Sequence, residues 1–195
     1  MSTNIDYEKI TFKDSFTIPN ILCYIRIVLI PIFIYIYVNA KEPRDYYIAG
    51  GIIFLSGLTD FCDGFIARKF NQVTELGKLI DPIADKLTQA AIIIALMFKV
   101  KWMFLLVVLF TIKELSMLIN GVILLRKGKK LDGAMWFGKV STAVFYLATF
   151  IIILFPMLNN IAVNTLMIIS AFFMGLSFIM YMIEYVKMYK EVKNK

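Results

Sequence analysis

The sequence predicts an all-α integral membrane protein with six transmembrane helices. Of its 195 residues, 60% are hydrophobic and only 18% are charged, and the mean hydropathy is +0.76. A soluble domain of this length would be roughly 45–50% apolar and about 25% charged. The apolar residues form segments of about 20, the length at which an α-helix crosses a bilayer, without the period-two alternation of a barrel strand. One membrane-embedded domain over residues 1–195 is therefore expected.

Polar residues mark the limits of each predicted span. Residues 1–19 are polar and of mixed charge, which predicts a short interfacial segment without the pattern of a signal peptide. The first span ends at a charged loop over 41–45, and the second at a polar stretch over 68–75. Lysines separate the third span from the fourth, a basic run over 126–130 follows the fourth, and a proline ends the fifth. The six spans are expected at about 21–40, 46–66, 79–98, 102–125, 134–155 and 161–185.

Basic residues are unevenly distributed between the two sides of this arrangement. Thirteen Lys and Arg side chains share the side of the two termini, and four lie on the opposite side. By the positive-inside rule, both termini face the cytoplasm of a multi-pass protein in the cell membrane. The net charge of +7 then reflects contact with anionic lipid headgroups rather than with nucleic acid.

Missing residue types narrow the chemistry. The chain contains no histidine, which excludes a Ser-His-Asp triad and a His-ligated zinc site. Cys23 and Cys62 lie far apart in or beside apolar runs, which indicates small buried hydrophobic residues rather than a disulfide or a metal site. Carboxylates and amines are the strongly acidic and basic groups that remain.

Four aspartates lie where charge is costly, at the cytoplasmic ends of two spans. Asp60 and Asp63 end the second span, and Asp81 and Asp85 begin the third. Spacings of three and four place each pair on one helical face, and an antiparallel hairpin would bring the two faces together. Four close carboxylates could not all ionise without cations. Oxygen ligands suit Mg²⁺ or Mn²⁺, and two such metals about 3.5–4 Å apart are usual for displacement at phosphorus.

Two other interpretations of these aspartates remain open. They could form salt bridges with Arg68, Lys78 and Lys86 at the ends of the loop. They could also line the path of a cation channel or transporter. Such a path usually places its acids near the middle of the bilayer, whereas these acids cluster at one edge, which favours an enzyme.

The spacing D-x2-D-G-x2-A-R-x8-G-x3-D-x3-D is present in residues 60–85, which read DFCDGFIARKFNQVTELGKLIDPIAD. This motif resembles that of the CDP-alcohol phosphotransferase family, a family of membrane enzymes with about six spans. The resemblance implies two divalent cations, Mg²⁺ or Mn²⁺, and CDP-diacylglycerol as donor. Asp60, Asp63, Asp81 and Asp85 would hold the metals. Asp85 would also accept the proton of the acceptor hydroxyl, which attacks the lipid-linked phosphorus and expels CMP.

The same motif implies a donor-binding site beside the aspartates. Gly64 and Ala67 would leave space for the cytidine, and Arg68 would contact the diphosphate or brace the acids. Gly77 would permit the turn into the third helix.

A narrower resemblance, to phosphatidylglycerophosphate synthases, covers residues 19–33 and 58–86. These enzymes join CDP-diacylglycerol to glycerol 3-phosphate. Gly121 and Ser141 stand where that group has basic residues, so a cardiolipin synthase of the same superfamily, with phosphatidylglycerol as acceptor, stays an alternative. Relatives are commonly homodimers, and a homodimer is expected. The acceptor-binding residues that the resemblance implies are Arg26, Lys113, Arg126 and Lys139.

Overall fold

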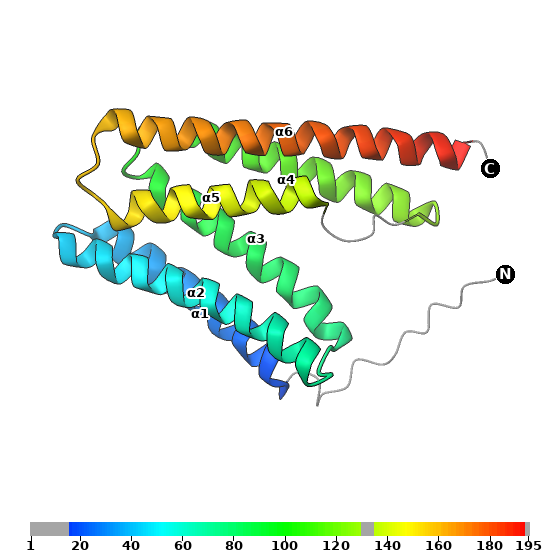
Figure 1. The fold of residues 1–195 in the computed structure, drawn as a ribbon, viewed down its shortest axis with the longest axis horizontal. Coiled ribbons are helices and arrows are strands. Elements are labelled where there is room, and N and C mark those ends of the chain that lie inside the picture. Colours follow the sequence, from blue (N-terminus) through cyan, green and yellow to red (C-terminus); the bar gives the residue numbers. More distant parts are fainter. Residues whose placement is uncertain (1–15, 130–134, 194–195) are drawn as a thin grey trace. The chain divides into compact units, whose positions relative to one another are not determined.

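A computed structural model describes residues 16–129 and 135–193, and over these ranges it contains six α-helices and no strand (Figure 1). The predicted all-α class is confirmed. The interfacial segment predicted over 1–19 falls mostly on residues 1–15, which lie outside the described residues. The helices are α1 (Ile18–Asn39), α2 (Pro43–Lys69), α3 (Glu75–Met97), α4 (Met103–Arg126), α5 (Trp136–Leu154) and α6 (Asn160–Lys193).

Five of these helices are long and apolar enough to cross a membrane: α1, α2, α4, α5 and α6. The helix outside this group is α3, whose first half carries a dense set of charges. The third predicted span, 79–98, and with it the count of six spans, therefore stay predictions. The charged residues in the first half of α3 are Glu75, Lys78, Asp81, Asp85 and Lys86.

The chain forms two compact units, which divide within α3 between Ile92 and Ile93. The first unit contains α1, α2 and most of α3, and the second contains the end of α3 with α4, α5 and α6. A single membrane domain over the whole chain stays a prediction.

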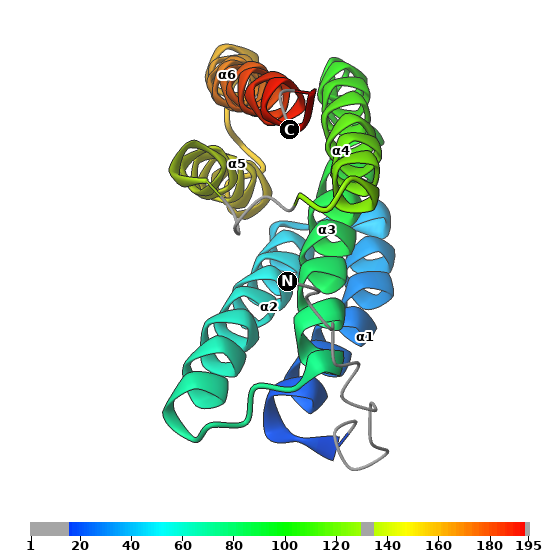
Figure 2. The same ribbon diagram turned by 90° about the vertical axis from the view of Figure 1, so that its right-hand side faces the viewer.

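In the first unit, α1 and α2 pack side by side as an antiparallel pair (Figures 1 and 2). A short loop joins them, and Glu42 and Asp45 form a capping box in which the Asp45 carboxylate accepts the backbone N–H of Glu42 at 3.1 Å. Together with Pro43 in the first turn, this cap starts α2 three residues before the predicted limit. Ala49 and Gly50 are buried, and such small residues let two helices approach closely.

The buried face of α2 leads from packing residues to a charged group. Ile53, Ser56, Thr59 and Asp63 are all buried, and their spacing of three or four residues places them on one side of the helix. The first of these positions is apolar and the last is a carboxylate. The face of α2 that packs inside the first unit therefore ends in one of the predicted site residues.

A tight turn joins α2 to α3. Asn71 has a φ of +52°, a left-handed conformation that Asn tolerates better than most residues. The N–H of Gln72 donates to the carbonyl of Ala67 at 2.9 Å, as at many helix ends that carry a left-handed residue. Thr74 then caps α3, since its Oγ1 accepts the N–H of Gly77 at 3.0 Å. The turn reverses the chain between the two aspartate pairs.

In the second unit, α6 packs against both α4 and α5. The sixth helix continues eight residues beyond the predicted limit of 185, because its apolar face continues as well. Tyr181, Tyr185 and Met188 share a buried cluster with Leu124 of α4 and Phe137 of α5. The lysine-rich C-terminal segment thus also contains packing residues at helical spacing. Because of its many lysines, the predicted span ends at 185.

Candidate functional site

One face of α1 carries three buried residues at intervals of three. Asn20, Cys23 and Arg26 lie on successive turns, and each is almost fully enclosed. A buried arginine requires carboxylate or carbonyl partners, because an unpaired charge is costly away from water. The face of α1 that meets α2 and α3 is therefore polar at this end.

The Arg26 guanidinium, 1% exposed, contacts all four aspartates of the motif. Its Nη1 lies 2.8 Å from Asp60, 3.4 Å from Asp81 and 2.6 Å from Asp85, and its Nη2 pairs with Asp63. Two of these acids come from α2 and two from α3. The structure thus brings the four carboxylates together, as their spacing predicts.

The four carboxylates differ in their access to solvent. The side chain of Asp63 is 5% exposed, whereas those of Asp60, Asp81 and Asp85 are 47%, 46% and 41% exposed. Each of these three more exposed acids offers an oxygen, and the oxygens lie within 4.8 Å of one another. Such an open group of carboxylate oxygens fits a hard divalent cation.

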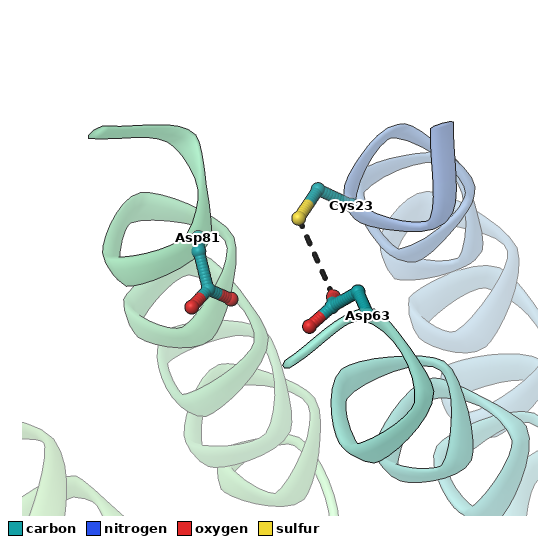
Figure 3. Close-up of side chains that lie close together, drawn as sticks. All are labelled: Cys23, Asp63 and Asp81. Atoms are coloured by element: carbon teal, nitrogen blue, oxygen red, sulfur yellow. Dashed lines mark hydrogen bonds between the residues drawn. The ribbon is translucent and has the colours of Figure 1, made fainter. Parts of the chain in front are cut away.

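Cys23 has a polar role that its apolar surroundings in the sequence did not reveal. Figure 3 shows its thiol donating a hydrogen bond to Asp63, with Sγ 3.4 Å from Oδ2. Asp81 of α3 lies opposite these two residues, and the three side chains form a second group whose ligand atoms lie within 4.8 Å of one another. The thiol is a soft donor and suits Mg²⁺ less well than the carboxylates do. The contact therefore indicates that the Cys23 thiol holds the Asp63 carboxylate in place rather than binding a metal ion itself.

A cavity of about 250 Å³ lies beside the aspartates, within the first unit. The four predicted donor-binding residues, Gly64, Ala67, Arg68 and Gly77, all line it, together with Asp63 and Asp81. At Gly64 a Cβ would lie 3.3 Å from Nη1 of Arg68, so a larger residue there would require the guanidinium to move by a few tenths of an ångström. The roles predicted for these residues stay predictions, but all four line the same cavity.

Arg26 is the predicted acceptor-binding residue whose surroundings differ most from expectation. Its guanidinium lies among the aspartates, on the α1 side of the cluster. Of the three loop-end cations that the alternative interpretation paired with the aspartates, Lys78 pairs instead with Glu75 within α3. The three-residue spacing of Asn20, Cys23 and Arg26 was the available signal, since it places all three on one face.

The other predicted acceptor-binding residues belong to the second unit. Lys113 is buried and pairs with Glu114, with Nζ 3.1 Å from Oε1. Arg126 and Lys139 are exposed, and Ser141, at a position where a basic residue was expected, is buried. Their roles in acceptor binding stay predictions.

Comparison with known proteins adds an independent finding. A family model described as CDP-alcohol phosphatidyltransferase matches residues 16–183. A CDP-diacylglycerol–glycerol-3-phosphate 3-phosphatidyltransferase from Rickettsia bellii is 46% identical over 84 residues, which are 42% of this chain and 45% of that protein. A human cardiolipin synthase (CMP-forming) is 41% identical over 86 residues, which are 44% of this chain and 27% of that protein.

A Streptomyces coelicolor cardiolipin synthase (CMP-forming) is 31% identical over 128 residues, or 65% of this chain and 60% of that protein. The chain thus spans less than half the length of the Rickettsia relatives that it matches. Proteins with both names are thus similar to this chain.

Proposed function

Since the chain belongs to the CDP-alcohol phosphatidyltransferase family, we propose that it transfers a phosphatidyl group from CDP-diacylglycerol to glycerol 3-phosphate. The products are phosphatidylglycerophosphate and CMP. The observation that carries this proposal is the convergence of four carboxylates from α2 and α3 beside a cavity. A channel would need such acids along a path across the membrane, whereas these acids gather around one arginine, and two of them, Asp63 and Asp81, line a cavity of about 250 Å³.

The four aspartates fit two divalent cations, Mg²⁺ or Mn²⁺. The donor atoms are carboxylate oxygens, and the single positive charge of Arg26 leaves the group with a net charge of about −3 when all four are ionised. Bound divalent cations would neutralise this charge and that of the diphosphate. Asp60, Asp81 and Asp85 form the more open part of the site, and Asp63 the enclosed part.

Asp85 is the proposed general base. Its carboxylate is 41% exposed and is held at 2.6 Å by Arg26, so it is both oriented and accessible to an incoming hydroxyl. The acceptor hydroxyl gives its proton to this carboxylate as its oxygen bonds to the phosphorus that carries the diacylglycerol. The bond from that phosphorus to the oxygen shared with CMP breaks, and CMP leaves with the electron pair.

The donor is proposed to lie in the cavity beside the aspartates. Gly64 and Ala67 leave its wall open for the cytidine, and Arg68 offers a cation for the diphosphate. Gly77 also lines the cavity, next to Asn20 of α1. The acyl chains would remain in the bilayer, which the apolar helices are long enough to cross.

The acceptor is the finer part of the proposal. Glycerol 3-phosphate carries close to two negative charges and needs several cations within hydrogen-bonding reach. Lys113, Arg126 and Lys139 are proposed for this role, whereas Arg26, which the sequence also indicated, is proposed to act on the acceptor only through the four aspartates that its buried guanidinium contacts. Phosphatidylglycerol carries one negative charge and would need fewer cations, and the Streptomyces coelicolor relative supports it as the second candidate.

The multi-pass chain is proposed to place its termini and active site on the cytoplasmic side, and to form a homodimer.

The direct test is an acceptor panel with the purified protein. With CDP-diacylglycerol and Mg²⁺ or Mn²⁺, we expect CMP release on addition of glycerol 3-phosphate, and loss of that release with EDTA. Release with phosphatidylglycerol and none with glycerol 3-phosphate would replace the proposed acceptor and keep the family activity. No CMP release with either acceptor would contradict the proposed activity itself.

Replacing Lys139 with alanine tests the proposed acceptor site. We expect the KM for glycerol 3-phosphate to rise about tenfold or more, because a charged hydrogen bond to a phosphate contributes about 1.5–3 kcal/mol. The KM for CDP-diacylglycerol should change far less. Lys187→Ala, which removes an exposed lysine paired with Glu184 on α6, is the matched control. Equal rises in both KM values would argue against an acceptor role.

A further inference from the structure

Asn20 joins the start of α1 to the first turn of α3. Its buried side-chain Nδ2 donates a hydrogen bond to Thr74 Oγ1 at 3.1 Å. The same oxygen accepts the N–H of Gly77 at 3.0 Å, and the Thr74 carbonyl accepts the N–H of Lys78 at 3.1 Å. Thr74 thus caps α3, and Asn20 holds that cap against α1.

Gly77 contributes to this contact by having no side chain. A Cβ at this position would lie 2.6 Å from Asn20 Oδ1 and 3.0 Å from Thr74 Oγ1. Real Cβ atoms do not approach other atoms as closely as the first of these distances. The Asn20 amide therefore fills the space over Gly77, and the backbone of α3 lies directly against it.

The position of this contact along α3 relates it to the aspartates. Asp81 follows Gly77 by four residues and Asp85 by eight, so all three lie on one face of the helix. On α1, Arg26 follows Asn20 by six residues on the same buried face and contacts both aspartates. A shift or tilt of the first turn of α3 would therefore displace both carboxylates relative to α1 and α2.

We propose that Asn20 is a positioning residue for the metal-binding aspartates, acting through the Thr74 cap and the backbone of Gly77. The proposal rests on the proposed function, which assigns the aspartates to divalent cations. Asn20 fixes α3 on α1 and so sets the distance between the aspartate pair of α3 and that of α2. Side chains that orient metal ligands in this way typically change metal affinity by about 10–100-fold when they are lost.

The test measures Mn²⁺ binding to the purified protein by electron paramagnetic resonance of the free ion, without lipid substrate. Asn20→Ala and Thr74→Val should each weaken binding by about 10–100-fold. The double variant should bind Mn²⁺ no more weakly than the single variant with the lower affinity, because both changes remove the same hydrogen bond. Thr74→Ser keeps the hydroxyl and is the matched control, expected within about threefold of the wild type.

Hydrogen exchange over residues 75–81 supplies a readout that needs no metal. The amides of Gly77 and Lys78 should exchange faster in Asn20→Ala and Thr74→Val than in Thr74→Ser, because the first turn of α3 loses its anchor. Wild-type Mn²⁺ affinity in Asn20→Ala and Thr74→Val overturns the proposal, whether or not exchange is faster, because the contact is then structural alone. If Asp81→Asn binds Mn²⁺ as tightly as the wild type does, the metal site of the proposed function is overturned instead.

Discussion

Replacing Asp85 with asparagine is expected to reduce CMP release by about 10²–10⁴-fold, the range that a general base contributes. The amide keeps the shape of the side chain and an oxygen that can contact a cation, but it cannot accept the proton of the acceptor hydroxyl. Binding of CDP-diacylglycerol should therefore persist in part while turnover is lost. The measurement is CMP release at saturating donor and metal, with donor binding followed separately on the same preparation.

The expected loss of turnover is separable from a loss of folding. The amide removes one of four neighbouring negative charges, so Asp85→Asn should not lower the thermal unfolding temperature in the absence of metal. Glu75→Gln is the matched control, because Glu75 is an exposed acid on the same helix and pairs with Lys78 rather than with the cluster. Near-normal turnover in Asp85→Asn would show that another group accepts the proton.

Replacing Arg26 with glutamine is expected to lower the free energy of unfolding by about 3–5 kcal/mol in the absence of metal. Loss of one partner from a buried ion pair costs this much because the remaining charges are left uncompensated. Here four carboxylates lose their shared cation, and the enclosed Asp63 is left with the weak hydrogen bond from the Cys23 thiol. The measurement is thermal or denaturant unfolding of the detergent-solubilised protein in EDTA.

Divalent cations should restore much of this stability. A cation that binds only the folded state stabilises it by mass action, and the Arg26→Gln site would carry more negative charge than the wild-type site. Addition of Mn²⁺ should therefore raise the unfolding temperature more in Arg26→Gln than in the wild type. Arg44→Gln, an exposed substitution in the first turn of α2, is the control. An Arg26→Gln protein as stable as the wild type in EDTA would contradict the assigned role of the ion pairs.

The positions of the helices could be predicted because their signals are local. Each predicted apolar segment corresponds to a helix, since about 20 apolar residues between polar ones favour a helix wherever they occur. The limits were less accurate where capping or packing decided them, as at Pro43 and in the extension of α6 past Tyr185. A cap depends on a few side chains, and the extension depends on residues of α4 and α5 that the sequence of α6 does not contain.

The sequence by itself determined that two aspartate pairs occupy two helical faces across a turn, because helical spacing alone decides which residues share a face. Which basic side chain pairs with these aspartates depended on the tertiary structure. Arg68, Lys78 and Lys86 are nearer in sequence, but Arg26 of α1 contacts all four acids. Which charged partner is reached depends on how α1 packs against α2 and α3, a long-range relation on which local spacing carries no information.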